Sequence, residues 1–145
     1  MKYLISVEIN ATREKVIEFF SDVNMLSKWQ PELQNFKILN GQFGERNSKT
    51  KLNYQYNGRP VEMIETILEN KLPDNLSAFY EAKNAKNWVK NEFISLNDNT
   101  TRWTIHSEFK CSGMLKLITI FFPGMFKKTS LKSMNRFKEL LEKNQ

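Results

Sequence analysis

The sequence predicts an α+β fold in which a curved, seven-stranded antiparallel sheet wraps around one long C-terminal helix, with two short helices between the first and second strands. Three patterns support this prediction. Residues 2–10 alternate in polarity, six further extended segments follow a short helical stretch, and the segment from residue 113 onward has a helical period. Because the sheet must hide one face, we expect the long helix to cover it.

The N-terminal segment predicts a strand and then a short amphipathic helix. The odd-numbered positions from Tyr3 to Ile9 are aromatic or aliphatic, which gives the strand one apolar face. Thr12 can cap the following helix, which has Glu14 in its first turn. The apolar positions of this helix recur at i, i+3, i+4 and i+7, at Val16, Phe19, Phe20 and Val23.

Pro31 follows the stretch "NMLSKW", residues 24–29. The proline ring disfavours helical geometry at Gln30 and supplies no N–H, so a helix cannot continue through it. Six extended segments follow, over residues 33–39, 47–57, 60–71, 76–84, 87–97 and 100–111. The turns between them contain the Asn, Gly, Pro and Asp residues of tight connections, so consecutive strands should form an antiparallel meander.

The last segment, residues 113–143, predicts the long helix. After Pro123 and Gly124, an apolar stripe runs through Leu131, Met134, Phe137, Leu140 and Leu141. A basic stripe runs beside it through Lys128, Lys132 and Arg136. The preceding stretch "MLKLITIFFPGMF" is the most apolar part of the chain, but it is too short to cross a bilayer as a helix. We expect this stretch to be buried or to form a lid.

Composition indicates one globular domain, residues 1–145, with a single core. The single cysteine, Cys111, allows no internal disulfide and no thiol cluster for zinc, which fits a reducing compartment. The N-terminus has no visible signal peptide, so a cytoplasmic location is expected. We expect no metal site and no cofactor.

The net charge of +6 is concentrated at one end of the chain. Residues 1–109 contain 14 basic and 14 acidic side chains, whereas residues 110–145 contain 8 basic ones against Glu139 and Glu142. This excess fits either a solvated helix face or an anionic partner. Transient contact with an anionic membrane through Lys128, Lys132 and Arg136 is one hypothesis. Nucleic-acid binding is disfavoured, because no glycine-rich phosphate loop or aromatic RNA-binding strand is present.

Several residues appear in an order and spacing that resemble a known superfamily. They are Ala11, Thr12, Val16, Asp22, Leu26, Trp29 and Pro31, followed by "ETILENKLPDNLSAFYE", "NDNTTRWTI" and "MNRFKELLEK". The sequence resembles the START, Bet v 1 and polyketide cyclase/dehydrase-like (SRPBCC) superfamily, which has the helix-grip fold. The resemblance implies that residues 24–29 form the second short helix, which ends before Pro31 and closes a groove beneath the C-terminal helix. Trp29 would then point inward as the cap of a cavity.

Few residues suggest catalysis. His106 is the only histidine, and strand alternation places it on the polar face, opposite to the face of Trp103. No catalytic residue is therefore assigned. On residues 60–71, one face carries Glu65 and Glu69, and the other carries Glu62. If the second of these faces looks into a cavity, Glu62 and Thr66 are candidates for contact with the polar group of a ligand.

The leading hypothesis is a non-catalytic protein that binds or carries a hydrophobic small molecule, such as a lipid, a quinone or a polyketide-like compound, between the sheet and the C-terminal helix. Small residues beside Tyr80 would leave room for such a ligand. The alternatives are a cyclase/dehydrase-like enzyme that moves a proton through Glu62 or Tyr80, and a protein-interaction module that uses the basic helix. The expected ligand-binding residues are Trp29, Tyr54, Tyr56, Glu62, Ile64, Thr66, Leu68, Tyr80, Trp103, Ile105 and Phe109.

Overall fold

A seven-stranded antiparallel sheet with the strand order β1-β7-β6-β5-β4-β3-β2 forms the body of the structure. The computed structural model describes residues 1–144, so Gln145, the last residue of the predicted domain, lies outside the described residues. The strands are β1 (Lys2–Ile9), β2 (Leu33–Asn40), β3 (Lys49–Tyr56), β4 (Arg59–Lys71), β5 (Asn75–Ala82), β6 (Ala85–Asn97) and β7 (Thr100–Cys111). Strands β2 to β7 form the predicted meander, and β1 pairs with β7.

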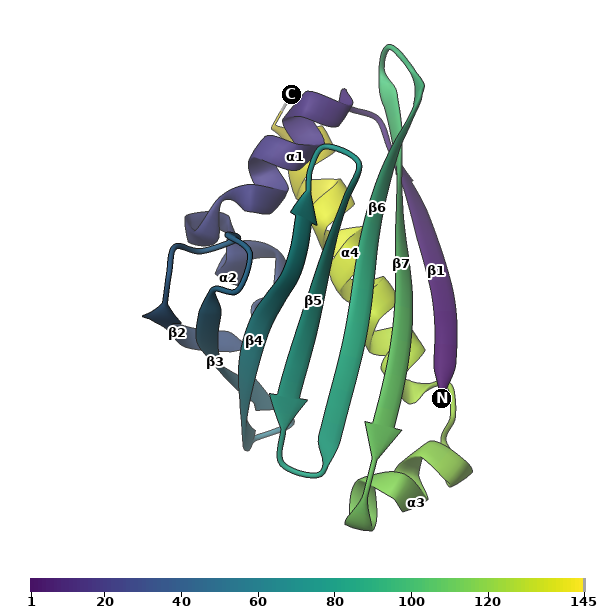
Figure 1. Ribbon diagram of the computed structural model, residues 1–145. Coiled ribbons are helices and arrows are strands. Elements are labelled where there is room, and N and C mark those ends of the chain that lie inside the picture. Colours follow the sequence, from purple (N-terminus) through teal and green to yellow (C-terminus); the bar gives the residue numbers. More distant parts are fainter. Residues whose placement is uncertain (145) are drawn as a thin grey trace.

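Helical elements occupy the two predicted regions of the chain. They are α1 (Arg13–Ser21), the 3-10 helix η1 (Val23–Met25), α2 (Leu26–Trp29), α3 (Gly113–Phe121) and α4 (Met125–Lys143). In Figure 1, α4 runs across one face of the curved sheet, and α1 and α2 lie at one end of it. The α+β class, the seven-stranded curved sheet and its long C-terminal helix are therefore confirmed.

Local interactions explain where the short helices begin and end. The Thr12 hydroxyl oxygen accepts a hydrogen bond from the Lys15 N–H at 3.3 Å, as expected of an N-cap. Helix α1 ends at Ser21, earlier than the apolar spacing predicted, because the Asp22 side chain accepts from the Asn24 N–H at 2.9 Å and starts η1. Val23 therefore belongs to η1. Helix α2 ends before Pro31, as predicted.

The turn between β5 and β6 differs from the expected position. We expected strands at 76–84 and 87–97, whereas β5 ends at Ala82 and β6 begins at Ala85. Only Lys83 and Asn84 separate the two strands, and Asn84 has a φ of 64°. Asparagine adopts this left-handed backbone more readily than most residues, which favours a tight turn at this position.

The predicted apolar stripe of α4 packs against the sheet. Met134 and Phe137 are fully buried, and Leu141 is 7% exposed. The ring of Phe137 lies 4.9 Å from the Trp103 ring of β7 and 5.3 Å from the Trp29 ring of α2, measured between centroids. These contacts tie the two helices and the sheet into one core, because closely spaced aromatic rings bury large apolar surfaces.

The apolar stretch before α4 forms α3, a separate helix at the end of the sheet that is remote from α1 (Figure 1). It is not buried as a whole: Met114, Ile120 and Phe121 are 73%, 62% and 71% exposed. Phe126, the last residue of the stretch, is half-buried and stacks on Phe109 at 4.7 Å. The expectation that this stretch is buried is therefore wrong for most of its residues.

Candidate functional site

The register of the strands defines which side chains face α4. Residues directly opposite each other in an antiparallel pair share a face. Trp103 of β7 lies opposite Val7 of β1 and Phe93 of β6, and all three belong to the core. Phe109, six residues after Trp103, therefore faces the same way. We call this side, which α4 covers, the inner face.

A row of polar side chains crosses the inner face from β3 to β6. Asn87 lies opposite Phe109, Tyr80 opposite Asn87, and Glu65 opposite Tyr80. The row ends at Thr50, which lies opposite Glu65. Polar residues are uncommon on a buried sheet face, because each buried polar group must find a hydrogen-bond partner or lose free energy. This row of Thr50, Glu65, Tyr80 and Asn87 is the polar row.

Glu65 lies at the centre of the polar row. It is only 9% exposed, and its Oε2 accepts a hydrogen bond from the Tyr80 hydroxyl at 2.8 Å. Among the described residues, no Lys or Arg forms an ion pair with it. Burial raises the pKa of Glu65, and the hydrogen bond from Tyr80 offsets only part of that effect. The site therefore favours the neutral carboxyl group.

The tyrosines around Glu65 are held in their neutral form. Burial, followed by the proximity of Glu65, raises the pKa of Tyr80 well above its usual value. Burial also raises the pKa of Tyr56 to about 12. The rings of Tyr54 and Tyr56 stack with centroids 5.4 Å apart, and the Tyr54 hydroxyl donates to Gln30 Oε1 at 2.6 Å. Neutral tyrosines keep their hydroxyl protons and remain hydrogen-bond donors.

Three buried polar atoms, on α2, on β3 and just before β3, lack a hydrogen-bond partner among the described residues. They are Thr50 Oγ1, Ser48 Oγ and Trp29 Nε1. Ser48 and Thr50 are 2% and 1% exposed. A buried donor or acceptor without a partner costs about 1–3 kcal/mol, which a ligand atom can recover by bonding to it. The inner face thus holds a hydroxyl group without a partner in residues 1–144, Thr50 Oγ1, directly opposite Glu65.

The end of the inner face beneath α1 and α2 is closed by aromatic side chains. Trp29 and Trp103 are 6% and 1% exposed, so both point inward, as predicted. Phe20 packs on Phe93 at 5.0 Å and on Trp103 at 5.7 Å between ring centroids. The Trp103 Nε1–H donates to Asn91 Oδ1 at 2.9 Å. Trp29 therefore caps a packed aromatic cluster.

The other end of the inner face is less covered. The inner-face side chains there are half-buried: Tyr56, Met63, Tyr80, Ile105 and Phe109. The start of α4 closes this end only in part, through the Phe126 ring on Phe109 and a hydrogen bond of 2.8 Å between the Tyr3 and Ser130 hydroxyls. The site therefore combines a polar row, a closed aromatic end and a partly open apolar end.

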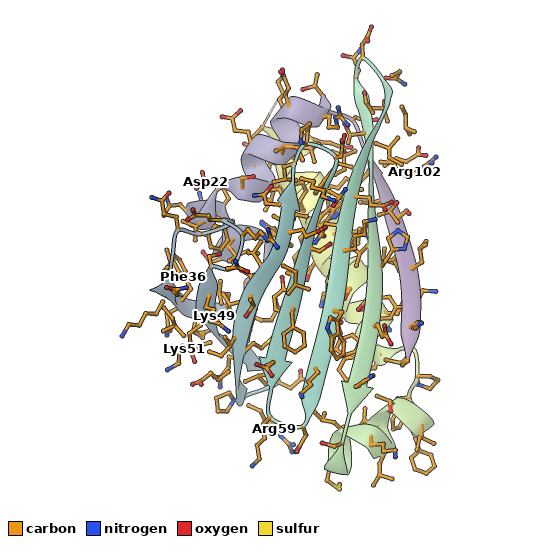
Figure 2. The ribbon with its side chains drawn as sticks, in the orientation of Figure 1. Asp22, Phe36, Lys49, Lys51, Arg59 and Arg102 are labelled. Carbon is orange, nitrogen blue, oxygen red and sulfur yellow. The ribbon has the colours of Figure 1, made fainter. Side chains whose placement is uncertain are left out.

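Four predicted site residues lie on the opposite, outer face, and this part of the prediction was wrong. Glu62 forms an ion pair of 3.6 Å with Lys51, and Thr66 Oγ1 accepts from Lys49 Nζ at 3.3 Å. Figure 2 shows both lysines on β3, near the β2 edge of the sheet. Ile64 lies opposite Lys51 and therefore shares the outer face.

The fourth of these residues, Leu68, sits at a register shift between β4 and β5 and is 38% exposed. The prediction took the wrong face of β4 as the inner one. Because side chains alternate along a strand, every site residue predicted on β4 therefore lies on the outer face. The same error hid Glu65, which the alternation places with Met63 and Ile67.

Two surface hollows lie outside the inner face. The larger, of about 550 Å³, is lined mainly by outer-face side chains that include Leu4, Leu68, Trp88 and His106. The smaller, of about 390 Å³, surrounds the ion pair between Arg13 and Asp74. His106 lies opposite Leu4 and Lys90 on the outer face, as predicted, with Nε2 at 3.3 Å from Glu92 Oε2.

Replacement of His106 by alanine should change the free energy of unfolding by no more than about 0.5 kcal/mol, because half-exposed polar contacts contribute little. Urea denaturation of wild type and His106→Ala measures this difference. Ligand binding should also be unchanged, since His106 faces away from the polar row. Loss of binding in this variant would contradict the assignment of the faces.

The basic stripe of α4 is also not uniform. Arg136 Nη1 donates to both carboxylate oxygens of Glu32, at 2.9 and 3.2 Å, and is half-buried. Partial burial of Glu32 opposes its ionisation, but the Arg136 hydrogen bonds outweigh this and lower its pKa. Lys128 and Lys132 are exposed and form no ion pair among the described residues. Arg136 is therefore a structural cation, and within this stripe only Lys128 and Lys132 are available to a partner.

The architecture matches solved structures over nearly its full length. A conserved protein from Geobacillus kaustophilus has a TM-score of 0.82 and 17% identity, covering 99% of this chain and 96% of its own. A START superfamily protein from Mycobacterium smegmatis has a TM-score of 0.79 and 15% identity, covering 99% of both chains. An aromatase/cyclase, ZhuI, from Streptomyces sp. R1128 has a TM-score of 0.81 and 13% identity, covering 98% of this chain and 93% of its own.

The chain has the helix-grip fold. This result confirms, at the level of the fold, the resemblance to the START, Bet v 1 and polyketide cyclase/dehydrase-like superfamily. No family model and no curated protein matches the sequence. In this helix-grip fold the concave side of the sheet and α4 together enclose the polar row, so the inner face is the candidate functional site.

Proposed function

We propose that residues 1–145 form a single domain that binds a hydrophobic small molecule carrying a polar oxygen, with the molecule lying between the sheet and α4. The observation that supports this most is the Glu65 carboxyl group. It is buried, it accepts from Tyr80, and it has no cationic partner among the described residues. A neutral carboxyl group in such a place can donate a hydrogen bond to a ligand carbonyl or hydroxyl oxygen.

The surroundings of Glu65 fit the rest of such a ligand. Thr50, with its unpartnered hydroxyl, lies directly opposite Glu65 and offers a second polar contact. Half-buried Met63, Ile105 and Phe109 provide apolar contacts toward the open end. Ligand sites of this kind are mostly apolar with a few convergent polar groups. The cluster around Trp29 would limit how far the ligand enters.

A second candidate function is acid catalysis on the bound molecule. The specific observation is again the buried Glu65 carboxyl group, whose raised pKa favours the protonated form that an acid catalyst needs. Tyr80 would hold the carboxyl group in place by its hydrogen bond of 2.8 Å. One of the similar structures is an aromatase/cyclase. Glu65 thus replaces Glu62 as the acidic candidate.

Two neutral naphthalene probes test the binding proposal. N-phenyl-1-naphthylamine lacks a carbonyl oxygen, whereas prodan carries a ketone. We expect both to bind with micromolar affinity, about −8 kcal/mol, in a fluorescence titration. Glu65→Leu should lower the affinity for prodan about tenfold more than the affinity for N-phenyl-1-naphthylamine, because only prodan loses a buried hydrogen bond. Glu65→Gln, which keeps an N–H donor, should retain most of the affinity.

Trp29→Ala should weaken both probes, because Trp29 forms part of the closed end of the site. Trp88→Ala is the matched control, since Trp88 lies opposite Glu108 and Phe79 on the outer face. Thermal melts of all variants establish that they are folded at the titration temperature. Absence of saturable binding to the wild type, or an equal effect of Trp88→Ala and Trp29→Ala, would refute the proposal.

A further inference from the structure

Helix α3 has an exposed apolar face. Met114, Leu117, Ile120 and Phe121 are 73%, 47%, 62% and 71% exposed, and their spacing places them on one side of the helix. The face continues into Phe122 and Met125, which are 65% and 42% exposed. Contiguous exposed apolar residues of this kind mark an interaction surface, because leaving them in water is unfavourable. We call these six residues the α3 apolar face.

Positive charge surrounds the α3 apolar face. From residue 110 to residue 138 the sequence contains six lysines, one arginine and no acidic residue. Lys116 lies within α3, and Lys127 and Lys128 lie in the first turn of α4. All three are exposed, and none has an ion-pair partner among the described residues. An apolar face bordered by unpaired lysines is complementary to a surface in which anionic groups lie above an apolar layer.

We propose that α3 docks onto an anionic lipid surface, with the α3 apolar face inserted among the acyl chains and Lys116, Lys127 and Lys128 at the lipid headgroups. A helix with these two properties lies in the plane of the interface. Across the described part of the chain, no helix has both the length and the hydropathy to cross a membrane. A second copy of the chain fits less well, because it would bring the same lysines against these ones.

The position of α3 links this surface to the inner face. The helix connects the end of β7 to the start of α4, and the Phe109–Phe126 stack joins those two elements at the partly open end of the site. Lipid docking would place that end next to the membrane. Docking itself needs no ligand in the interior, so vesicle binding and probe binding can be lost independently.

Vesicle co-sedimentation of the full chain tests the proposal. Vesicles of phosphatidylcholine alone are compared with vesicles of phosphatidylcholine and phosphatidylglycerol, at low and high salt. We expect salt-sensitive binding to the anionic vesicles only. The variant Lys116→Glu, Lys127→Glu, Lys128→Glu should reduce the partition coefficient at least about tenfold. The variant Ile120→Gln, Phe121→Gln should reduce it to a similar degree.

Matched controls separate docking from the overall positive charge. One control reverses the charge of three exposed lysines on α1, α2 and β2, and so changes the net charge by the same amount as the α3 lysine variant: Lys15→Glu, Lys28→Glu, Lys37→Glu. Leu4→Gln, Ile94→Gln removes exposed apolar residues from the sheet. Both controls should bind nearly as well as wild type, with unchanged thermal melts throughout. Equal binding to neutral vesicles, equal losses in the controls, or self-association that depends on Ile120 and Phe121 without vesicle binding would each overturn the proposal.

Discussion

Replacement of Trp103 by alanine is expected to lower the free energy of unfolding by about 3–5 kcal/mol, as for other large-to-small changes of buried aromatic residues. Trp103 is 1% exposed, and its ring lies against Phe20, Trp29, Phe93 and Phe137. The substitution also removes the indole N–H that donates a hydrogen bond to the buried Asn91 side chain, which leaves that acceptor without a partner. Urea denaturation at neutral pH measures the loss.

Trp88→Ala provides a matched comparison for this effect. Trp88 is half-buried on the outer face, where it packs on Phe79 at 4.9 Å and lies 5.4 Å below Lys110 Nζ. Less apolar surface is lost there, so we expect a decrease of about 1–2 kcal/mol. Similar losses for the two tryptophans would mean that the cluster around Trp103 does not form the main core.

The fold was predictable because its local signals agree with one another. Thr12 marks a helix start, Pro31 marks a helix end, and the α4 stripe from Leu131 to Leu141 has a clear helical period. Each of these signals depends on residues close together in the sequence. The exception is the β5–β6 turn. The sequence "AKN" occurs twice in a row there, so the turn could be placed at either copy, and in the structure the left-handed backbone lies at Asn84, in the first copy.

The site was less predictable because it depends on contacts between distant residues. Both faces of β4 are half apolar, with Met63 and Ile67 on one and Ile64 and Leu68 on the other, so composition alone could not choose the inner one. Pairing with Tyr80, 15 residues away, makes the choice. Arg136 likewise continued a basic stripe in the sequence, and only the fold brings it to Glu32, 104 residues away.

The burial of the Glu65 carboxyl group should make stability depend on pH. Because burial raises the native-state pKa of Glu65, the folded protein keeps this proton over a range in which the unfolded chain has lost it. The contribution of Glu65 to stability is therefore fully present below its unfolded pKa and is lost as the pH rises through its native pKa. Glu65→Gln does not titrate, so we expect this variant to gain stability relative to wild type with rising pH.

Tyr80→Phe tests the same pair from the other side. It removes the donor to Glu65 Oε2 and should cost about 1–3 kcal/mol, because a buried acceptor is left without its partner. The cost should be larger near about pH 9 than near about pH 4, since a hydrogen bond to an ionised carboxylate is roughly twice as strong as one to a neutral group. Urea denaturation of wild type, Glu65→Gln and Tyr80→Phe at both pH values measures these differences. A Tyr80→Phe cost independent of pH, together with parallel profiles for wild type and Glu65→Gln, would show that the native-state pKa of Glu65 is not raised above its unfolded value, and the neutral acid assigned to the site would have to be abandoned.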